Sequence, residues 1–323
     1  MRVNIIFLIL CSLALSSAGC SREEAVDENA FQTREWAFLF YDDAVVWSAP
    51  CLMGAIECMY EIRHQTKIYV GSEAVSGYCY WKYALKDIRE ILTSSPHIDT
   101  MELGNIIISC IEDNLWMVEN EYYGQSRFIT MSAVRTDKIQ GLVALFDEIV
   151  RYYADHPVKY NTYLNGRYDE IETYGENNDF NMDMHSLAAF LLNRETDPGI
   201  VSRLRELQNE IEEAVIAETH GWMYPDSHGI AIHHPNVDTF FLHDEWNGWY
   251  QQVEFAQDTR WDDIMINYLG IQTTSVAPES GTLLEWMRKM GSGEVLKIPM
   301  KVPATLIIQL HDVSEPANVM VPL

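Results

Sequence analysis

The sequence predicts an α/β protein in which helices flank a layered sheet. Residues 36–41 and 67–72 are short apolar segments, rich in the aromatic and β-branched residues that favour strands. Residues 53–64 and 83–93 follow them and carry apolar side chains at helical spacing. Strands that alternate with helices in this way are typical of a sheet covered by helices.

The middle of the chain is predicted to be mainly helical. Residues 138–154 carry Leu142, Phe146 and Ile149 on one face, and Pro157 ends this helix. Asp197-Pro198 starts a further helix, whose apolar stripe runs on to Val215. The other expected elements are helices over 102–118 and 183–193 and an extended segment over 127–134.

The C-terminal segment, residues 271–323, has a different pattern. From Val295 onward apolar residues alternate with others, and Pro299 and Pro303 interrupt the run. Proline is confined to the edges of sheets because it cannot donate a hydrogen bond to a neighbouring strand. We therefore expect a small β appendage with edge strands.

Composition limits the classes of function. The chain has 323 residues, of which 48% are hydrophobic, so it can bury a substantial core as one large or two small domains. Its formal net charge is −26 and it has no cluster of basic residues. We therefore do not expect nucleic-acid binding, because a protein needs such clusters to bind a phosphate backbone.

The N-terminus predicts export. Arg2 precedes an apolar run over residues 5–15, and a Ser-Ala-Gly-Cys sequence ends at Cys20. This order is that of a bacterial lipoprotein signal over residues 1–20, with Cys20 as the lipidated residue and a polar tether over 21–33. We expect a protein anchored by lipid in the cell envelope, facing the periplasm or the surface. An ordinary cleaved signal is the alternative.

Cys51 is the candidate nucleophile. It follows an apolar extended stretch at the point where a strand would lead into a helix. The first-turn amides and the positive end of a helix favour the thiolate form of a cysteine placed there. The alternative is a small buried cysteine that fills a tight turn.

Three sequence blocks support the first interpretation. Residues 51–57 read Cys-Leu-Met-Gly-Ala-Ile-Glu, residues 70–74 read Val-Gly-Ser-Glu-Ala, and residues 77–83 read Gly-Tyr-Cys-Tyr-Trp-Lys-Tyr. In order and spacing these blocks resemble the core of the clostripain-like cysteine peptidase family. The resemblance extends over residues 34–270, which we interpret as the peptidase domain, and it does not cover 271–323.

The resemblance implies a caspase-haemoglobinase-like α/β sheet and a cysteine endopeptidase that acts on peptide or protein substrates without a cofactor. Cys51 would be the catalytic nucleophile. The residues implied in substrate binding are Glu73, Cys79, Trp81 and Tyr83.

The sequence departs from the family where the mechanism needs a base. The family carries a His-Gly pair at the end of the strand beside the nucleophile's strand, yet only nine residues separate Tyr41 from Cys51. A parallel crossover needs a dozen or more residues, so we expect a sheet truncated by loss of inner strands. Of the possible substitutes, His220 is predicted at a helix C-terminus, His228 at the start of a late strand, and His64 at the far end of the helix after Cys51.

The acids implied for the specificity pocket are also changed. Ala49 stands where the family has an aspartate two residues before the nucleophile, and Cys79 stands where a second acid is common. A carboxylate is the natural partner of a guanidinium. Preference for arginine is therefore not expected.

These departures lead to a main hypothesis and two alternatives. The main hypothesis is a clostripain-family endopeptidase homologue whose hydrolysis is impaired, a pseudoenzyme or a weak enzyme. The first alternative is a non-catalytic envelope lipoprotein that binds peptides through the retained cleft. The second is a deletion product that folds poorly, because missing inner strands expose sheet edges.

The cysteines and histidines raise two further possibilities. Cys51 and Cys58 are too far apart along one helix for a disulfide, whereas Cys79 could pair with Cys51 across the pocket. The cluster with zinc-ligand character comprises His228, His233, His234, His243, Asp244 and Glu245. Adjacent histidines on a strand point to opposite faces, so we expect no metal in this cluster.

Overall fold

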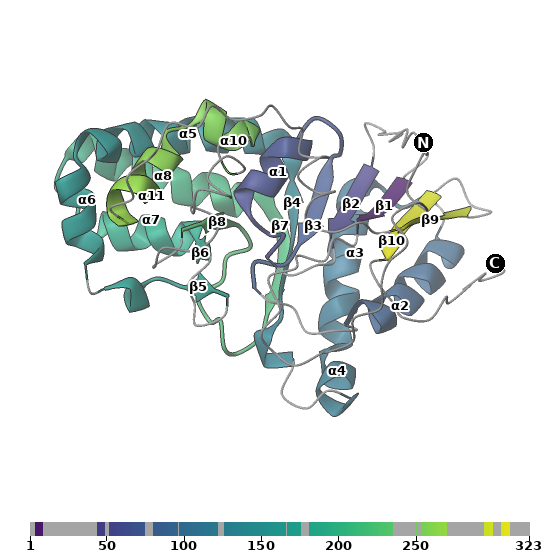
Figure 1. The fold of residues 1–323 in the computed structure, drawn as a ribbon. Helices are drawn as coiled ribbons and strands as arrows, with labels where there is room; N and C mark the ends of the chain where they lie inside the picture. Colours follow the sequence, from purple (N-terminus) through teal and green to yellow (C-terminus); the bar gives the residue numbers. More distant parts are fainter. Residues whose placement is uncertain are drawn as a thin grey trace, which may run out of the picture.

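The computed structural model describes most of the chain between residues 44 and 269 and short strands at both ends. The described ranges are 4–8, 44–48, 52–74, 80–95, 97–121, 126–165, 167–175, 181–234, 250, 253–269, 294–299 and 305–310. Within them the fold is α/β, with helices on both faces of a sheet (Figure 1). The predicted fold class is thereby confirmed.

The main sheet has seven strands in the order β7-β4-β3-β2-β1-β10-β9. β2 pairs in parallel with both β1 and β3, whereas β4 is antiparallel to β3 and to β7. The strands are β1 (Asn4–Leu8), β2 (Ala44–Ser48), β3 (Ile68–Gly71), β4 (Thr130–Arg135), β7 (Val215–His220), β9 (Glu294–Pro299) and β10 (Thr305–Leu310). A second sheet, in the order β5-β6-β8, consists of β5 (Thr173–Tyr174), β6 (Asn181–Asp183) and β8 (Ala231–His233).

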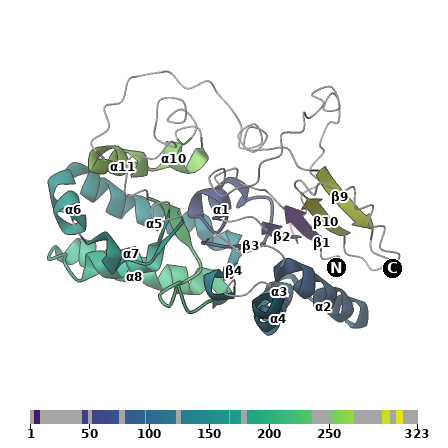
Figure 2. The ribbon, with the colours of Figure 1, turned by 60° about the horizontal axis from the view of Figure 1, so that its bottom comes forward.

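Helices cover the two faces of the main sheet unequally. Figure 2 shows α2 and α3 on one side of β2, β3 and β4, and α1 on the other side. The helices are α1 (Ile56–Ile62), α2 (Tyr80–Ser94), α3 (Thr100–Asp113), α4 (Leu115–Glu121), α5 (Thr136–Asp155), α6 (Pro157–Leu164), α7 (Met184–Leu192), α8 (Pro198–Ala214), α10 (Glu254–Asp258) and α11 (Trp261–Leu269).

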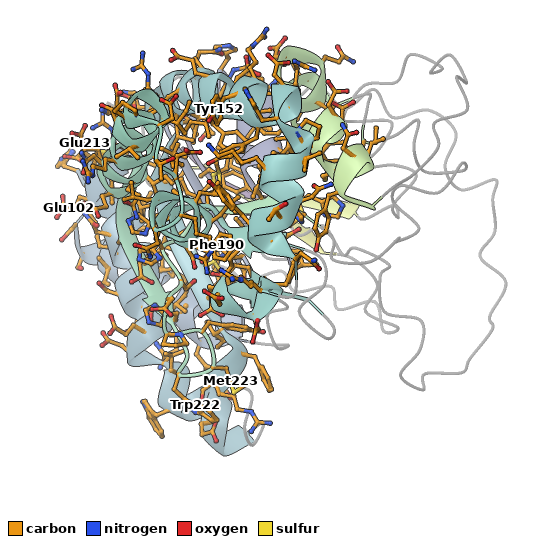
Figure 3. All side chains as sticks on the ribbon, turned by 90° about the vertical axis from the view of Figure 1, so that its left-hand side faces the viewer. Glu102, Tyr152, Phe190, Glu213, Trp222 and Met223 are labelled. Atoms are coloured by element: carbon orange, nitrogen blue, oxygen red, sulfur yellow. The ribbon has the colours of Figure 1, made fainter. Side chains whose placement is uncertain are left out.

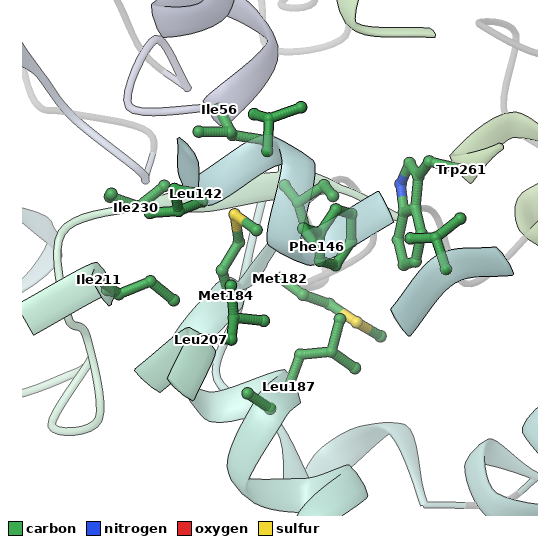
Figure 4. Close-up of a cluster of buried hydrophobic side chains, with 14 of the residues drawn as sticks. Ile56, Leu142, Phe146, Met182, Met184, Leu187, Leu207, Ile211, Ile230 and Trp261 are labelled. Carbon is green, nitrogen blue, oxygen red and sulfur yellow. The ribbon is translucent and has the colours of Figure 1, made fainter. Parts of the chain in front are cut away.

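The two cores follow from alternation along the strands. Val45 and Trp47 of β2 pack with α2 and α3, whereas Val46 faces the larger core with α1, α5, α7 and α8. In the larger core Phe146 of α5 lies 5.2 Å, centroid to centroid, from Trp261 of α11 (Figure 4). Side chains that alternate between faces have period two, which is why one strand serves both cores.

Most expected elements are present, with shifted ends. The segments predicted at 67–72, 53–64, 83–93 and 138–154 correspond to β3, α1, α2 and α5. The helix predicted at 102–118 is divided into α3 and α4, with Asn114 between them. The strand predicted at 36–41 lies outside the described residues, and β2 directly precedes the Cys51 turn instead.

The C-terminal strands are part of the main sheet. β9 and β10 pair with each other in antiparallel, and β10 pairs in parallel with β1 at Ile5↔Leu306. The prediction of β strands in this segment is confirmed, but the prediction of a separate appendage is wrong, because β10 pairs with β1 within the main sheet. β1 itself falls within the segment that the sequence predicts as a cleaved signal. Removal of that segment would take away the strand that joins β10 to β2.

Candidate active site

The turn that follows β2 carries the candidate nucleophile. Cys51 itself lies outside the described residues, between Ser48 at the end of β2 and Leu52. Leu52 has a φ of 62°, a left-handed conformation that is uncommon for residues other than glycine. Its N–H donates to the carbonyl of Ala74 at 3.0 Å. The turn is therefore fixed against the segment that leaves β3.

Gly54 binds this turn to two other parts of the chain. Its N–H donates to the carbonyl of Ser72 at 2.7 Å, and its own carbonyl accepts the N–H of Ala231 at 2.9 Å. A Cβ on Gly54 would lie 2.7 Å from the backbone nitrogen of Glu73. The sequence blocks at 51–57 and 70–74 are thus in contact, together with the late strand β8.

The turn departs from the expected strand-to-helix junction. α1 begins at Ile56, after the N-cap residue Ala55, so Cys51 does not lie in the first turn of the helix. The amides of Leu52 and Gly54 are already donated to backbone carbonyls. The predicted start of this helix at Met53 is therefore wrong, because the intervening residues pair with the segment after β3 and with β8.

The sheet edge next to this turn is formed by strands of both directions. β2 and β3 end there, and β4 begins there because it is antiparallel to β3. Thr130, the first residue of β4, accepts the N–H of Ala74 at 2.9 Å through its hydroxyl and pairs with His220 at the end of β7. His220 therefore lies at the same edge as the Cys51 turn, with β4 and β3 between β7 and β2.

A buried carboxyl group supports this edge from within. Glu73 is 1% exposed, and its Oε2 accepts a hydrogen bond from the hydroxyl of Ser227. Ser227 in turn accepts from the hydroxyl of Tyr174 at 2.8 Å. Burial, together with the nearby charge of Asp183, raises the pKa of Glu73 well above its ordinary value. Burial therefore favours the neutral form of the Glu73 carboxyl.

A second buried carboxyl lies on α1. Glu57 is 7% exposed, and its Oε1 accepts the N–H of His233 at 3.1 Å and the hydroxyl of Tyr250 at 2.8 Å. Its pKa is raised to about 7, because burial disfavours the charged form more than these hydrogen bonds favour it. Glu57 therefore joins α1 to β8 and to Tyr250.

The histidines considered as substitute bases lie in three different places. His220 is the last residue of β7, so its predicted position at a helix C-terminus is wrong: α8 ends earlier, at Ala214. His228 precedes β8, as predicted, and His64 lies beyond the C-terminal end of α1.

The two histidines closest to this part of the fold each have a carboxylate beside the ring. His220 Nδ1 lies 2.8 Å from Glu218 Oε2, and His228 Nδ1 lies 3.3 Å from Asp183 Oδ1. Hydrogen bonding to Asp183 raises the pKa of His228. Each ring thus has a carboxylate within this chain as a partner.

The remaining predicted site residues are only partly described. Cys20 and Cys79 lie outside the described residues. Trp81 lies in the first turn of α2, and Tyr83 packs against the core between α2, α3 and the sheet. Of the four residues implied in substrate binding, Glu73 is therefore placed beside the Cys51 turn and Tyr83 against the core.

The described thiols are reduced and buried to different degrees. Cys58 and Cys110 are free cysteines. Burial raises the pKa of Cys110 to about 11 and that of Cys58 further. Neither is an activated nucleophile.

Some residues of this region carry no signal that sequence reasoning recognised. Asp183 and Ser227 contribute to the buried network around Glu73, although they are distant from Cys51 in the chain. Asp183 is recognisable only as a helix N-cap, since its side chain accepts the N–H of Ser186.

An exposed apolar turn lies at the same sheet edge. Trp222 is 70% exposed and Met223 is 41% exposed, and Figure 3 shows both at the narrow end of the molecule. The next residue, Tyr224, belongs to a buried cluster that Leu52 packs against. The exposed turn is therefore connected to the turn at Leu52 through this buried cluster.

In the described part of the chain, no helix has the length and apolar character needed to cross a membrane.

Comparison with known proteins gives structural neighbours only. No family model and no curated protein matches the sequence. A cysteine protease from B. fragilis matches with a TM-score of 0.44 and 12% identity, over 70% of this chain and 90% of that one. A clostripain from Bacteroides thetaiotaomicron, solved with a peptide inhibitor, matches with a TM-score of 0.45 and 14% identity, over 67% and 86%.

A third solved structure is an inactive zymogen of a C11 protease from Parabacteroides distasonis. Its TM-score is 0.43 and its identity 15%, over 68% of this chain and 59% of that one. All three neighbours are cysteine proteases. The clostripain family that the sequence blocks resemble is represented among them.

Proposed function

We propose that this chain is a clostripain-type cysteine endopeptidase homologue in which Cys51 occupies the nucleophile position and peptide hydrolysis is absent or weak. One observation carries the proposal. The sequence block around Cys51 forms a turn at the end of β2, held against the Ser72–Ala74 block by Leu52 and Gly54. The described part of this turn, from Leu52 to Gly54, lies at the carboxyl end of two parallel strands, where α/β proteins gather functional groups.

The loss of hydrolysis follows from the neighbours of β2. A cysteine nucleophile needs a base within about 3 Å to hold the thiolate and to protonate the leaving amine. β3 flanks β2 on one side, and β1, which lies within the predicted signal, flanks it on the other; neither strand contains or is directly followed by a histidine. The first histidine of the sequence is His64, beyond α1. The adjacent strands therefore offer no imidazole for Cys51.

The substrate class is an unstructured peptide or protein segment without preference for arginine. Ala49 and Cys79 replace the two acids that the family resemblance implies for the pocket. Glu73 is buried and bonded to Ser227, so we assign it to supporting the Cys51 turn rather than to contact with a basic side chain.

The proposal is tested by turnover of a peptide panel. We expect the wild-type chain to release less product than a family peptidase by a factor of about 10³ or more, because a positioned acid–base group contributes about 10²–10⁴-fold to a rate. Cys51→Ala should leave the residual rate unchanged. Turnover that is readily measured in the wild type and disappears in Cys51→Ala would show that a base is present.

The second candidate function is peptide binding without chemistry, by an envelope protein anchored through Cys20 and the tether at 21–33. The exposed Trp222-Met223 turn favours it. Large exposed apolar side chains are frequent in interaction sites, and tryptophan is enriched among residues that dominate binding.

Replacing Trp222 should separate binding from folding. We expect Trp222→Ala to weaken peptide binding about tenfold, equivalent to about 1.4 kcal/mol, and Met223→Ala to weaken it less. Fluorescence polarisation with a labelled peptide measures both. Met101→Ala is the matched control, because Met101 is similarly exposed, at 39%. It lies at the start of α3, and Gly104 of the same helix lies near Ile68 of β3 and Ile216 of β7, at the opposite edge of the sheet. Equal losses at Met101 and Met223 would contradict the assignment.

A further inference from the structure

Three side chains from separate parts of the chain bring potential metal ligands together. Asp183 ends β6, His185 lies in the first turn of α7, and His228 precedes β8. One ligand atom from each lies within 4.8 Å of the other two. Among the residues that the structure describes, this is the group with that property.

The distance between two of the potential ligands suits a tetrahedral ion. Asp183 Oδ1 lies 3.3 Å from His228 Nδ1. Two ligands bound at the usual zinc distances of about 2.0–2.1 Å, at the tetrahedral angle, are themselves separated by about 3.3 Å. The His185 and His228 rings are stacked, with centroids 3.9 Å apart and planes inclined by 22°. Because a coordinated metal lies near the plane of each imidazole, one of the two stacked rings must rotate about its side-chain torsions for both to bind the same ion.

The hydrogen bonds of the group leave capacity for a ligand. The Nδ1 atom of His185 is buried and has no hydrogen-bond partner in the described part of the chain. Its Nε2 lies 3.4 Å from Glu212 Oε1, the outer-shell carboxylate that usually orients a metal-bound histidine. Asp183 is 0% exposed, and its two oxygens accept the N–H groups of Ser186 and His228. Each carboxylate oxygen has a second lone pair.

One contact must be exchanged when an ion binds. His228 Nδ1 also lies 2.7 Å from the carbonyl of Asp226, to which a protonated nitrogen donates. Coordination through this nitrogen releases that proton and replaces the hydrogen bond by a metal–ligand bond.

We propose that Asp183, His185 and His228 form a binding site for zinc or a similar divalent transition ion. Two imidazoles and one carboxylate are the donor set of zinc sites that keep a fourth position for water. Of the cluster considered from sequence, His243, Asp244 and Glu245 lie outside the described residues, and the three described histidines have different neighbours. The backbone N–H of His233 donates to Glu57, whereas the ring of His234 lies 5.4 Å from that of Trp261.

The site would join α7 to the segment before β8. That segment includes Ser227, whose hydroxyl donates to the Glu73 carboxyl beside the Cys51 turn. Bound ion should therefore stabilise the fold, because a ligand that binds only the native state raises the free energy of unfolding. The proposal does not depend on hydrolysis or peptide binding.

The test uses the full, tag-free chain, freed of metal by a chelator and titrated with zinc sulfate by calorimetry. We expect one zinc per chain, a higher thermal unfolding temperature with zinc, and losses of affinity of at least about 100-fold in His185→Ala and in His228→Ala. Glu212→Gln should cost about 10–100-fold. The control is His97→Ala, an exposed histidine between α2 and α3, which should leave the affinity unchanged.

Two results would overturn the site. One is the absence of stoichiometric zinc by elemental analysis. The other is zinc binding that His185→Ala and His228→Ala leave unchanged while both variants unfold cooperatively. Cobalt titration gives an independent readout, since a tetrahedral site yields strong visible absorption that both histidine variants should abolish.

Discussion

Replacing Gly54 by alanine is expected to lower the free energy of unfolding by about 3 kcal/mol, the upper end of the usual cost of overpacking. The added Cβ would lie 2.7 Å from the nitrogen of Glu73 and 2.8 Å from the carbonyl carbon of Ser72. Both are backbone atoms, and the Gly54 N–H and carbonyl are themselves hydrogen-bonded to Ser72 and Ala231. The clash cannot be relieved without separating the Cys51 turn from its supports.

Urea denaturation followed by circular dichroism measures this effect, and Gly141→Ala is its control. Gly141 lies in α5, and no atom lies within 4 Å of the position its Cβ would take. Alanine is the better helix former, so Gly141→Ala should raise the free energy of unfolding by about 0.5–1 kcal/mol. A Gly54→Ala variant as stable as Gly141→Ala would show that the Cys51 turn is not packed as described.

The second large effect is a dependence of stability on pH that originates in Glu57. Its pKa is about 7 in the folded chain, against an ordinary value of 4.5. Because the folded value is raised, the stabilising contribution is complete below pH 4.5 and is lost as the pH rises to about 7. At about 1.4 kcal/mol for each pKa unit, Glu57 should cost the folded state about 3 kcal/mol above pH 7.

Glu57→Gln should remove this dependence. The glutamine carbonyl can accept the same hydrogen bonds from the His233 N–H and the Tyr250 hydroxyl, and it has no charge to desolvate. At pH 8 the variant is expected to be more stable than the wild type, and at pH 4.5 nearly equal to it. Glu102→Gln, an exposed position in the first turn of α3, is the control. If the wild type and Glu57→Gln lose the same stability between pH 4.5 and pH 8, the effect belongs to another group.

The sequence predicts those elements whose core face is set by local spacing. α5 was expected because Leu142, Phe146 and Ile149 recur at helical intervals, and these residues are buried as expected. β3 and α2 were expected for similar reasons. The signal is strong here because burial on one face selects the same residue types at fixed intervals.

β7 shows where local spacing fails. The apolar stripe of α8 continues into Val215, and the glycine after His220 has the form of a helix stop. In the structure α8 ends at Ala214 and the next six residues form β7, which pairs with β4. Pairing with a strand distant in sequence overrides the local preference of these residues.

The candidate active site was predictable where one sequence block carries it. Leu52 and Gly54, from the block that the resemblance singled out, form a turn, and Glu73 lies beside it. Asp183 and Ser227 reach the same region through β6 and the segment before β8. Their position depends on long-range contacts, which leave no periodic pattern in the sequence.

The histidines illustrate the same distinction. Four of them lie close together in sequence between residues 228 and 243, which suggested a cluster. In the described part of the chain, His228 lies instead against His185, from the start of α7. Proximity along the chain was therefore a poor guide, because the segment before β8 and the segment after it lead to different neighbours.

The most direct test of the missing base is the pH profile of Cys51 alkylation in a Cys79→Ala background. The raised pKa values of Cys58 and Cys110 should make both thiols react slowly. Peptide mapping then distinguishes their alkylation from that of Cys51. We expect the alkylation rate of Cys51 to rise with pH in one step near the ordinary thiol pKa of about 8.5, and to be the same in His220→Ala and His228→Ala. A rate that is already high at pH 6, and that falls at least tenfold in one histidine variant, would place an imidazole beside the sulfur and contradict the account.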